Sequence, residues 1–190
     1  MMKATWVALL GVILPAGLMA GTEHGHAPYA GWDGRAIKAL PAEQVDDLRN
    51  GRGMGLALAA ELNGYPGPRH VLELADALEL SAEQQAEAQR LFDAMQAEAI
   101  VLGEQVIAAE AALDRLFATG TASDAAIMAA AVEVGRAQGV LRGHHLRYHL
   151  AMRAALSPHQ VMRYQQLRGY AGEHRHAPAG TGSGAAANGS

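Results

Sequence analysis

Residues 81–118 read SAEQQAEAQRLFDAMQAEAIVLGEQVIAAEAALDRLFA, and this stretch decides the fold. Its apolar residues recur at alternating spacings of four and three, the heptad pattern of a helix that packs along its whole length against another helix. At the usual helical rise, the stretch predicts a rod about 57 Å long that ends at Gly120. The expected packed positions are Ala88, Phe92, Met95, Ala99, Leu102, Val106, Ala109, Leu113 and Leu116.

A second long helix is expected to follow almost at once. Residues 121–124, TASD, offer Thr121 as a helix cap with an acidic residue three positions later. The helix then continues to about Ala155, with inward positions at Ile127, Val134, Leu141, Tyr148 and Met152. Two long helices joined by so short a loop must pack as an antiparallel hairpin of the coiled-coil type.

Charge favours the same pairing of two arms. Residues 73–133 carry twelve acidic and two basic side chains, whereas residues 136–175 carry seven arginines and one acid. Exposed ion pairs contribute only about 0.2–1 kcal/mol each, so charge selects the partner helix while the apolar positions hold it.

Shorter helices are expected on the N-terminal side of the hairpin. Residues 54–62 predict a short helix with Met54, Leu58 and Leu62 on one face, and Pro68 suits the first turn of the next helix. The apolar positions of that next segment are Val71, Leu74, Ala75 and Leu78. The predicted fold class is therefore all-α, an elongated antiparallel helical hairpin with short flanking helices.

One short motif, Leu-Ser-x-x-Gln, occurs twice. In each copy the serine is placed to cap a helix, and the glutamine falls where its side chain reaches back to the amide of the cap, which is a capping box. Pro158 strengthens the second copy as a first helical residue. The motif is predicted to be architectural, and its residues are Leu80, Ser81, Gln84, Leu156, Ser157 and Gln160.

The two ends of the chain differ from its middle. Residues 1–20, MMKATWVALLGVILPAGLMA, have the basic start, apolar run and small residues of a secretory signal peptide. Residues 21–35 are expected to form a flexible lead-in, residues 36–171 the helical domain, and residues 172–190 a disordered Gly/Ala/Ser-rich tail. The expected location is the periplasm, without stable membrane insertion once the signal is cleaved.

Composition narrows the classes of function. The chain has no cysteine, which excludes disulfides and a thiol nucleophile, and its formal net charge of −4 does not suit nucleic-acid binding. The sequence offers no nucleophile with a base, no paired-carboxylate site and no phosphate-binding loop. Enzymatic activity is therefore not expected.

The paired motifs, in an exported, alanine-rich helical chain, resemble the LTxxQ-motif family of periplasmic proteins. That family contains the Spy and CpxP chaperones, the zinc-associated ZraP proteins and the CnrX-like heavy-metal sensors. The resemblance covers about residues 40–170, and residues 53–84, GMGLALAAELNGYPGPRHVLELADALELSAEQ, look like a proteobacterial heavy-metal-sensor-like or Spy/CpxP-like subgroup. It implies a bent helical hairpin, dimerised into a shallow cradle, that holds unfolded clients without ATP or senses metals.

The chain departs from the chaperone pattern in its charge. Spy-like cradles are rich in lysine, whereas Lys38 is the one lysine beyond the signal peptide, and the chain is net acidic. The leading hypothesis remains a dimeric, ATP-independent chaperone or envelope-stress accessory that binds unfolded or misfolded envelope proteins. The alternatives are a heavy-metal sensor or metal buffer, and an accessory that docks on a sensor kinase or an anti-sigma factor.

Nine histidines carry the metal hypothesis. His145, His149 and Met152 share one face of the second long helix, and such a histidine pair suits Zn, Ni, Co or Cu. The resemblance to CnrX-like sensors suggests a further ligand from His70 or Glu73. The competing interpretation is structural, with His145 and Tyr148 filling a half-polar seam while His144 and His149 are solvated or paired with acids of the first arm. The termini offer a second, weaker set of metal ligands, which consists of His24, His26, His174 and His176.

Overall fold

The computed structural model describes residues 28–170. The chain divides into two units, residues 1–33 and residues 34–190, and each is described by itself. In the first unit the rings of Tyr29 and Trp32 meet edge to face, with their centroids 5.2 Å apart. The expected signal peptide, most of the lead-in, the tail, and His24, His26, His174 and His176 all lie outside the described residues.

The described part of the second unit is helical and has no β-strand, so the all-α prediction is confirmed. A 3-10 turn, Trp32–Gly34, ends where this unit begins. Six α-helices follow in the order α1 (Ala42–Arg49), α2 (Leu58–Glu61), α3 (Pro68–Glu73), α4 (Ala82–Ala118), α5 (Asp124–Ala155) and α6 (Pro158–Leu167). None of the helices within residues 28–170 has both the length and the apolarity needed to cross a membrane.

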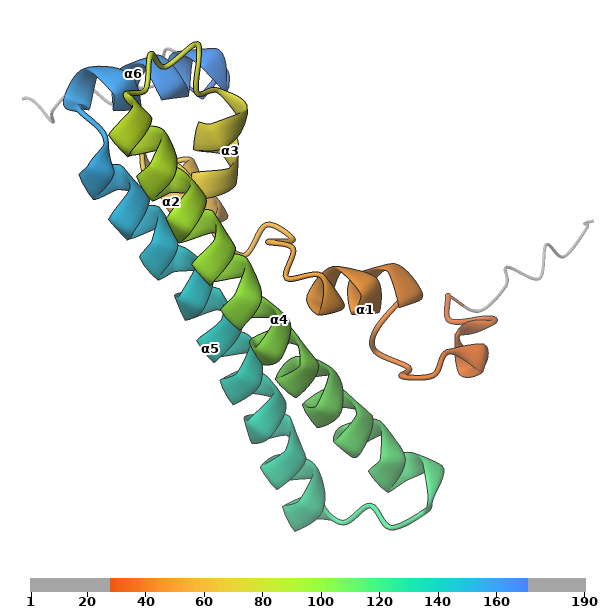
Figure 1. Ribbon diagram of the computed structural model, residues 1–190. Helices are drawn as coiled ribbons and strands as arrows, with labels where there is room; N and C mark the ends of the chain where they lie inside the picture. The colour runs from red at the N-terminus through yellow and green to blue at the C-terminus, as the bar shows by residue number, and fades with distance from the viewer. Residues whose placement is uncertain (1–27, 171–190) are drawn as a thin grey trace, which may run out of the picture. The chain divides into compact units, whose positions relative to one another are not determined.

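Helices α4 and α5 form the predicted hairpin. They run antiparallel and side by side, with α3 and α6 at the end away from their connecting loop (Figure 1). The predicted inward residues Val134, Leu141 and Met152 are buried. The ion pair of Arg147 with Glu98 joins the two arms, whereas the pairs of Arg90 with Glu87 and of Arg136 with Glu133 each lie within one helix.

The packed face of α4 differs in detail from the heptad prediction. Leu91 is buried where Phe92 was expected, and Leu113 and Leu116 stay partly exposed near the loop. The buried surface also extends to a second face, because α1 crosses α4 there. At the crossing, a Cβ on Gly103 would lie 2.3 Å from the backbone oxygen of Leu48, so only glycine permits this approach.

Both predicted capping boxes are present. The hydroxyl of Ser81 accepts a hydrogen bond from the amide of Gln84 at 3.2 Å, and the side chain of Gln84 accepts from the amide of Ser81 at 3.1 Å. Ser157 and Gln160 repeat this geometry at 3.2 and 2.9 Å. The two copies are therefore equivalent starts of α4 and α6.

The two copies of the motif also bind each other. The side-chain amides of Gln84 and Gln160 exchange a pair of hydrogen bonds, each 2.9 Å long. Their nitrogens also donate to the carbonyls of Ala155 and Leu78. The repeat thus closes the hairpin end by joining the starts of α4 and α6, and this role goes beyond capping.

Two local expectations were wrong. Ser123, not Thr121, caps α5, because the helix begins at Asp124 and its cap is the residue immediately before. The short helix near residue 58 comprises only Leu58–Glu61, and its predicted apolar face is turned outward: Leu58 and Leu62 are each 54% exposed. The buried side of this turn carries Glu61 instead.

Candidate functional site

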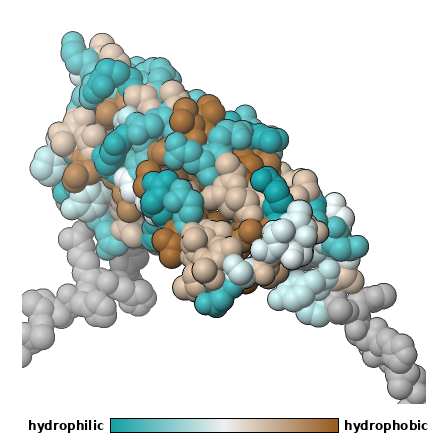
Figure 2. Space-filling model, turned by 90° about the horizontal axis from the view of Figure 1, so that it is seen from below, coloured by the Kyte–Doolittle hydropathy of each residue, from teal (hydrophilic) through white to brown (hydrophobic). Residues whose placement is uncertain are grey.

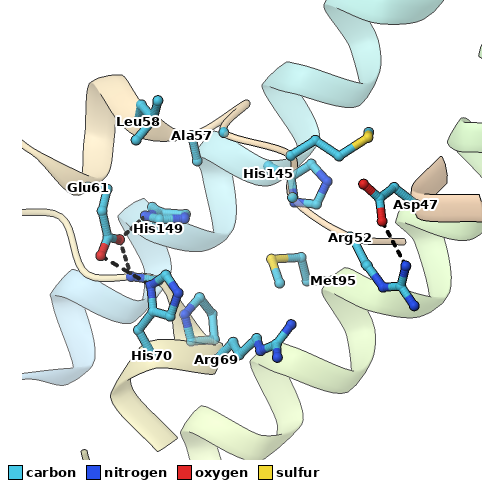
Figure 3. A pocket seen from close by; sticks show the side chains of 15 residues that line it. Asp47, Arg52, Ala57, Leu58, Glu61, Arg69, His70, Met95, His145 and His149 are labelled. Carbon is cyan, nitrogen blue, oxygen red and sulfur yellow. Dashed lines mark hydrogen bonds and ion pairs between the residues drawn. The ribbon is translucent and has the colours of Figure 1, made fainter. Parts of the chain in front are cut away.

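A cavity of about 370 Å³ opens where the α2 and α3 segments meet the half of the hairpin that lies away from its connecting loop (Figure 3). Most of its wall comes from loops and helix ends that precede α4, and the rest comes from one face of α4 and α5. The lining residues whose side chains can act as metal ligands are Asp47, Met54, Glu61, His70, Met95, His145 and His149.

Glu61 is the most highly connected polar residue of this region, although it is only 4% exposed. Its carboxylate accepts hydrogen bonds from the hydroxyl of Tyr164, from Nδ1 of His70 at 3.1 Å and from the amide of Gly67 at 3.2 Å. The guanidinium of Arg168 lies 3.9 Å away. One carboxylate therefore joins α2, the α2–α3 loop, α3 and α6.

The surroundings of Glu61 shift the acidities of the pair it forms with Tyr164. Burial, the largest single influence, raises the pKa of Glu61. The hydrogen bonds from His70 and Tyr164 and the charges of His70 and His149 lower it by more in total, so the pKa of Glu61 lies below its usual range. Burial and the hydrogen bond to Glu61 raise the pKa of Tyr164. At neutral pH the pair is thus a carboxylate and a neutral phenol.

His70 and His149 are held by their Nδ1 atoms. Nδ1 of His70 donates to Glu61, and Nδ1 of His149 lies 2.7 Å from the backbone oxygen of Tyr65, which can only accept. In the neutral ring the proton is then on Nδ1, and the lone pair is on Nε2. A Cβ on Gly67 would lie 2.8 Å from the ring of His149, so this position needs glycine.

His145 is different from these two histidines. It is 2% exposed and lines the same cavity, and its Nε2 has no hydrogen-bond partner. Burial, helped by the nearby charges of His144 and His149, lowers the pKa of His145 to about 4. At neutral pH its imidazole is therefore uncharged.

His144 has both ring nitrogens occupied. Its Nε2 lies 2.8 Å from the backbone oxygen of Met95, and its Nδ1 lies 3.0 Å from the guanidinium of Arg147. A neutral ring with its proton on Nε2 satisfies both contacts. The same Nδ1 also lies 3.4 Å from the carboxylate of Glu98.

The predicted site residues separate into two groups. His70, His145 and His149 come together at the cavity. Met152 is fully buried in the core near Tyr164, and Glu73 is paired with Arg69 on the exposed side of α3 at 3.0 Å. Within residues 28–170, no three His, Cys, Asp or Glu side chains are arranged so that they could hold a metal ion together.

Several lining residues were missing from the sequence-based site. Glu61 was not singled out within the short helix expected at residues 54–62, Met95 was expected only as a packed position of the long helix, and Met54 only as part of an apolar face. Met54 has a backbone φ of +44°, which is rare for a residue with a side chain, and Gly55 follows at +76°. The sequence signal for this turn is Gly-Met-Gly at residues 53–55.

Comparison with protein-family models, with curated proteins and with solved structures finds no match to this chain.

Proposed function

We propose that the protein binds a transition-metal ion in this cavity and acts in the cell envelope as a metal sensor or metal buffer. The observation that carries the proposal is the unpartnered Nε2 of His145, which is buried at the cavity wall. A buried ring nitrogen without a hydrogen-bond partner costs free energy, typically about 1–3 kcal/mol. A metal ion that accepts its lone pair would remove that cost.

The neighbouring histidines support the same function. Histidines that bind metals commonly donate their other ring N–H to a carboxylate or to a backbone carbonyl, which fixes the ring and makes the free nitrogen more basic. His70 makes such a hydrogen bond to the carboxylate of Glu61, and His149 makes one to the carbonyl of Tyr65. In each of these rings Nε2 is then the nitrogen left to bind a metal.

Calorimetric titration of metal-free protein with Zn(II), Ni(II), Co(II) and copper tests the proposal. We expect micromolar or tighter binding of at least one ion, and its loss in His145→Leu. That substitution removes an unsatisfied buried nitrogen, so the fold should tolerate it. His159→Gln, at an exposed position of α6, is the matched control and should bind as the unmodified protein does. Absence of binding to all four ions would end the proposal.

A second candidate function is the holding of unfolded envelope proteins. Its support is an apolar stripe along the outer face of α5, opposite the side that packs on α4, which consists of Met128, Val132, Leu146 and Leu150. Met128, Val132 and Leu150 are each more than half exposed. Hydrophobic patches also lie among hydrophilic ones in the view from below (Figure 2). Contiguous exposed apolar surface is typical of interaction sites.

The same stripe supports the expected homodimer. Val132 and Leu146 each lie seven residues from Gly139, and Met128 and Leu150 each lie eleven residues from it. An antiparallel second copy of α5 centred on Gly139 would therefore bring the apolar positions at equal distances on either side of Gly139 into contact across the two copies, with small Gly135 and Gly143 allowing close approach. Docking on a sensor kinase or anti-sigma factor remains a further proposal for the same face.

A double substitution on the stripe tests both uses of it. We expect Val132→Glu with Leu150→Glu to convert a dimer to a monomer in sedimentation experiments, and to abolish suppression of a denatured client's aggregation at near-stoichiometric amounts. Val101→Glu, at a position of α4 that is 58% exposed, is the control and should change neither readout. Full suppression by the double variant would show that clients bind elsewhere, and no suppression by the unmodified protein would remove the chaperone function.

A further inference from the structure

The geometry points to a soft monovalent ion, Cu(I), as the metal of this cavity, bound by Nε2 of His145 and by the thioether sulfurs of Met54 and Met95. This inference rests on the proposed metal-binding function and specifies the class of metal. All three residues line the one cavity, and they come from the loop after α1, from α4 and from α5. His145 and Met95 both point into it in Figure 3.

Met95 is held firmly at the cavity wall. It is 8% exposed within the long helix α4, and its backbone oxygen receives the hydrogen bond from Nε2 of His144. That bond joins α4 to α5 one residue before His145. The two helices therefore fix the positions of Met95 and His145 relative to each other, as a ligand pair requires.

Met54 reaches the cavity through a strained turn. Its φ of +44° costs roughly 1–2 kcal/mol for a residue with a Cβ. Strained backbone conformations of this kind persist where the surroundings impose them, and they cluster at binding sites. The flanking Gly53 and Gly55 allow the sharp turn that places Met54 in the wall of the cavity.

The charges around the cavity favour a monovalent ion. The carboxylate of Glu61 already accepts three hydrogen bonds, and Asp47 is paired with Arg52 at 2.7 Å. The donors left over are the Nε2 atoms of His70, His145 and His149 and the thioethers of Met54 and Met95, none of which carries a negative charge. Transferring a divalent ion to such a shell costs far more free energy than transferring a monovalent one, because the penalty grows with the square of the charge. Thioether ligands also select soft Cu(I) over Zn(II) or Ni(II).

The test measures the affinity of the full-length protein for Cu(I), under anaerobic reducing conditions, against a coloured Cu(I) chelator. Ag(I), which is soft and does not change oxidation state here, serves as a second probe by calorimetry. Met54→Leu and Met95→Leu keep side-chain volume, so they should fold. Each should weaken Cu(I) and Ag(I) binding roughly tenfold or more, since a lost contact of about 1.4 kcal/mol is a tenfold change. Met152→Leu, in the core away from the cavity, is the matched control and should leave the affinity unchanged.

X-ray absorption of the copper-loaded protein gives a second readout, because sulfur and nitrogen neighbours of the metal are distinguishable. We expect sulfur scatterers that diminish in each cavity methionine variant and persist in Met152→Leu. A shell of nitrogen and oxygen alone would overturn the inference. Tight Zn(II) or Ni(II) binding that needs His145 but neither methionine would also overturn it, while leaving the proposed metal-binding function in place. Absence of binding to any of these ions would overturn both.

Discussion

Glu61→Ala is expected to lower the free energy of unfolding by about 3–5 kcal/mol, the range seen when one partner of a buried charged network is removed. The substitution leaves the hydroxyl of Tyr164, the amide of Gly67 and a nitrogen of His70 without their acceptor. Tyr164 is fully buried in the unmodified protein, so its hydroxyl is shielded from water as long as Glu61 is in place. For a folded unit of this size we expect a fall in Tm of roughly 10 °C. Urea unfolding followed by circular dichroism measures the free energy directly.

The control for Glu61 is Glu73→Ala. Glu73 is also acidic and also ion-paired, but it and Arg69 are largely exposed, so its loss should cost less than about 1 kcal/mol. Glu61→Gln keeps one side-chain oxygen and should fall between the two. Equal effects of Glu61→Ala and Glu73→Ala would contradict the central role that we assign to the buried carboxylate.

A double-substitution cycle separates the loss of the network from the loss of volume. Tyr164→Phe removes the hydroxyl that Glu61→Ala would leave unsatisfied. If the hydroxyl is the source of much of the cost, the double variant should be more stable than the sum of the two single effects predicts. Strict additivity would show that the two side chains act independently.

The hairpin could be predicted from the sequence because its determinants are local. The alternating spacings of residues 88–116, the capping serines Ser81 and Ser157, and the turn at Gly120 each act over a few neighbouring residues. The exact packed face of α4 was harder to predict from the sequence. Helix α1 lies on α4 at Gly103, and no pattern within α4 shows that a distant helix crosses there.

The cavity could be predicted only in part, for a related reason. His145 and His149 share a helical face by their spacing, and the structure also places His70 beside them. Glu61 was overlooked because its contacts come from residues up to 103 positions away, and because the short helix around it was expected to turn its apolar side inward. The structure turns the helix the other way, since the carboxylate gains Tyr164, His70 and Gly67 as partners while Leu58 and Leu62 remain in water.

The pH dependence of stability should identify His145 in the metal-free protein. Burial lowers the folded-state pKa of His145 to about 4, against 6.5 for an unperturbed histidine. Between these two values the unfolded chain binds a proton that the folded protein does not. The free energy of unfolding must therefore fall as the pH falls through 6.5 toward 4, and the contribution of His145 fades as the pH rises above 6.5.

The expected size follows from the same two pKa values. Between pH 7 and pH 5, the unmodified protein should lose about 2 kcal/mol more stability than His145→Leu, which has no proton to bind at this position. Other titratable groups near His145, namely Asp47, Arg52, Glu61, Arg69, His70, His144 and His149, are common to both proteins, so the comparison cancels much of their contribution.

Urea unfolding at pH 7, 6 and 5, with a metal chelator present, measures this difference. His159→Gln, the exposed control on α6, should retain the pH dependence of the unmodified protein, whereas His145→Leu should show a flatter curve. Parallel curves for the unmodified protein and His145→Leu would mean that the buried imidazole takes up its proton in the folded state as readily as in water. In that case Nε2 would have access to solvent, and the unpartnered nitrogen that motivates the metal site would lose its significance.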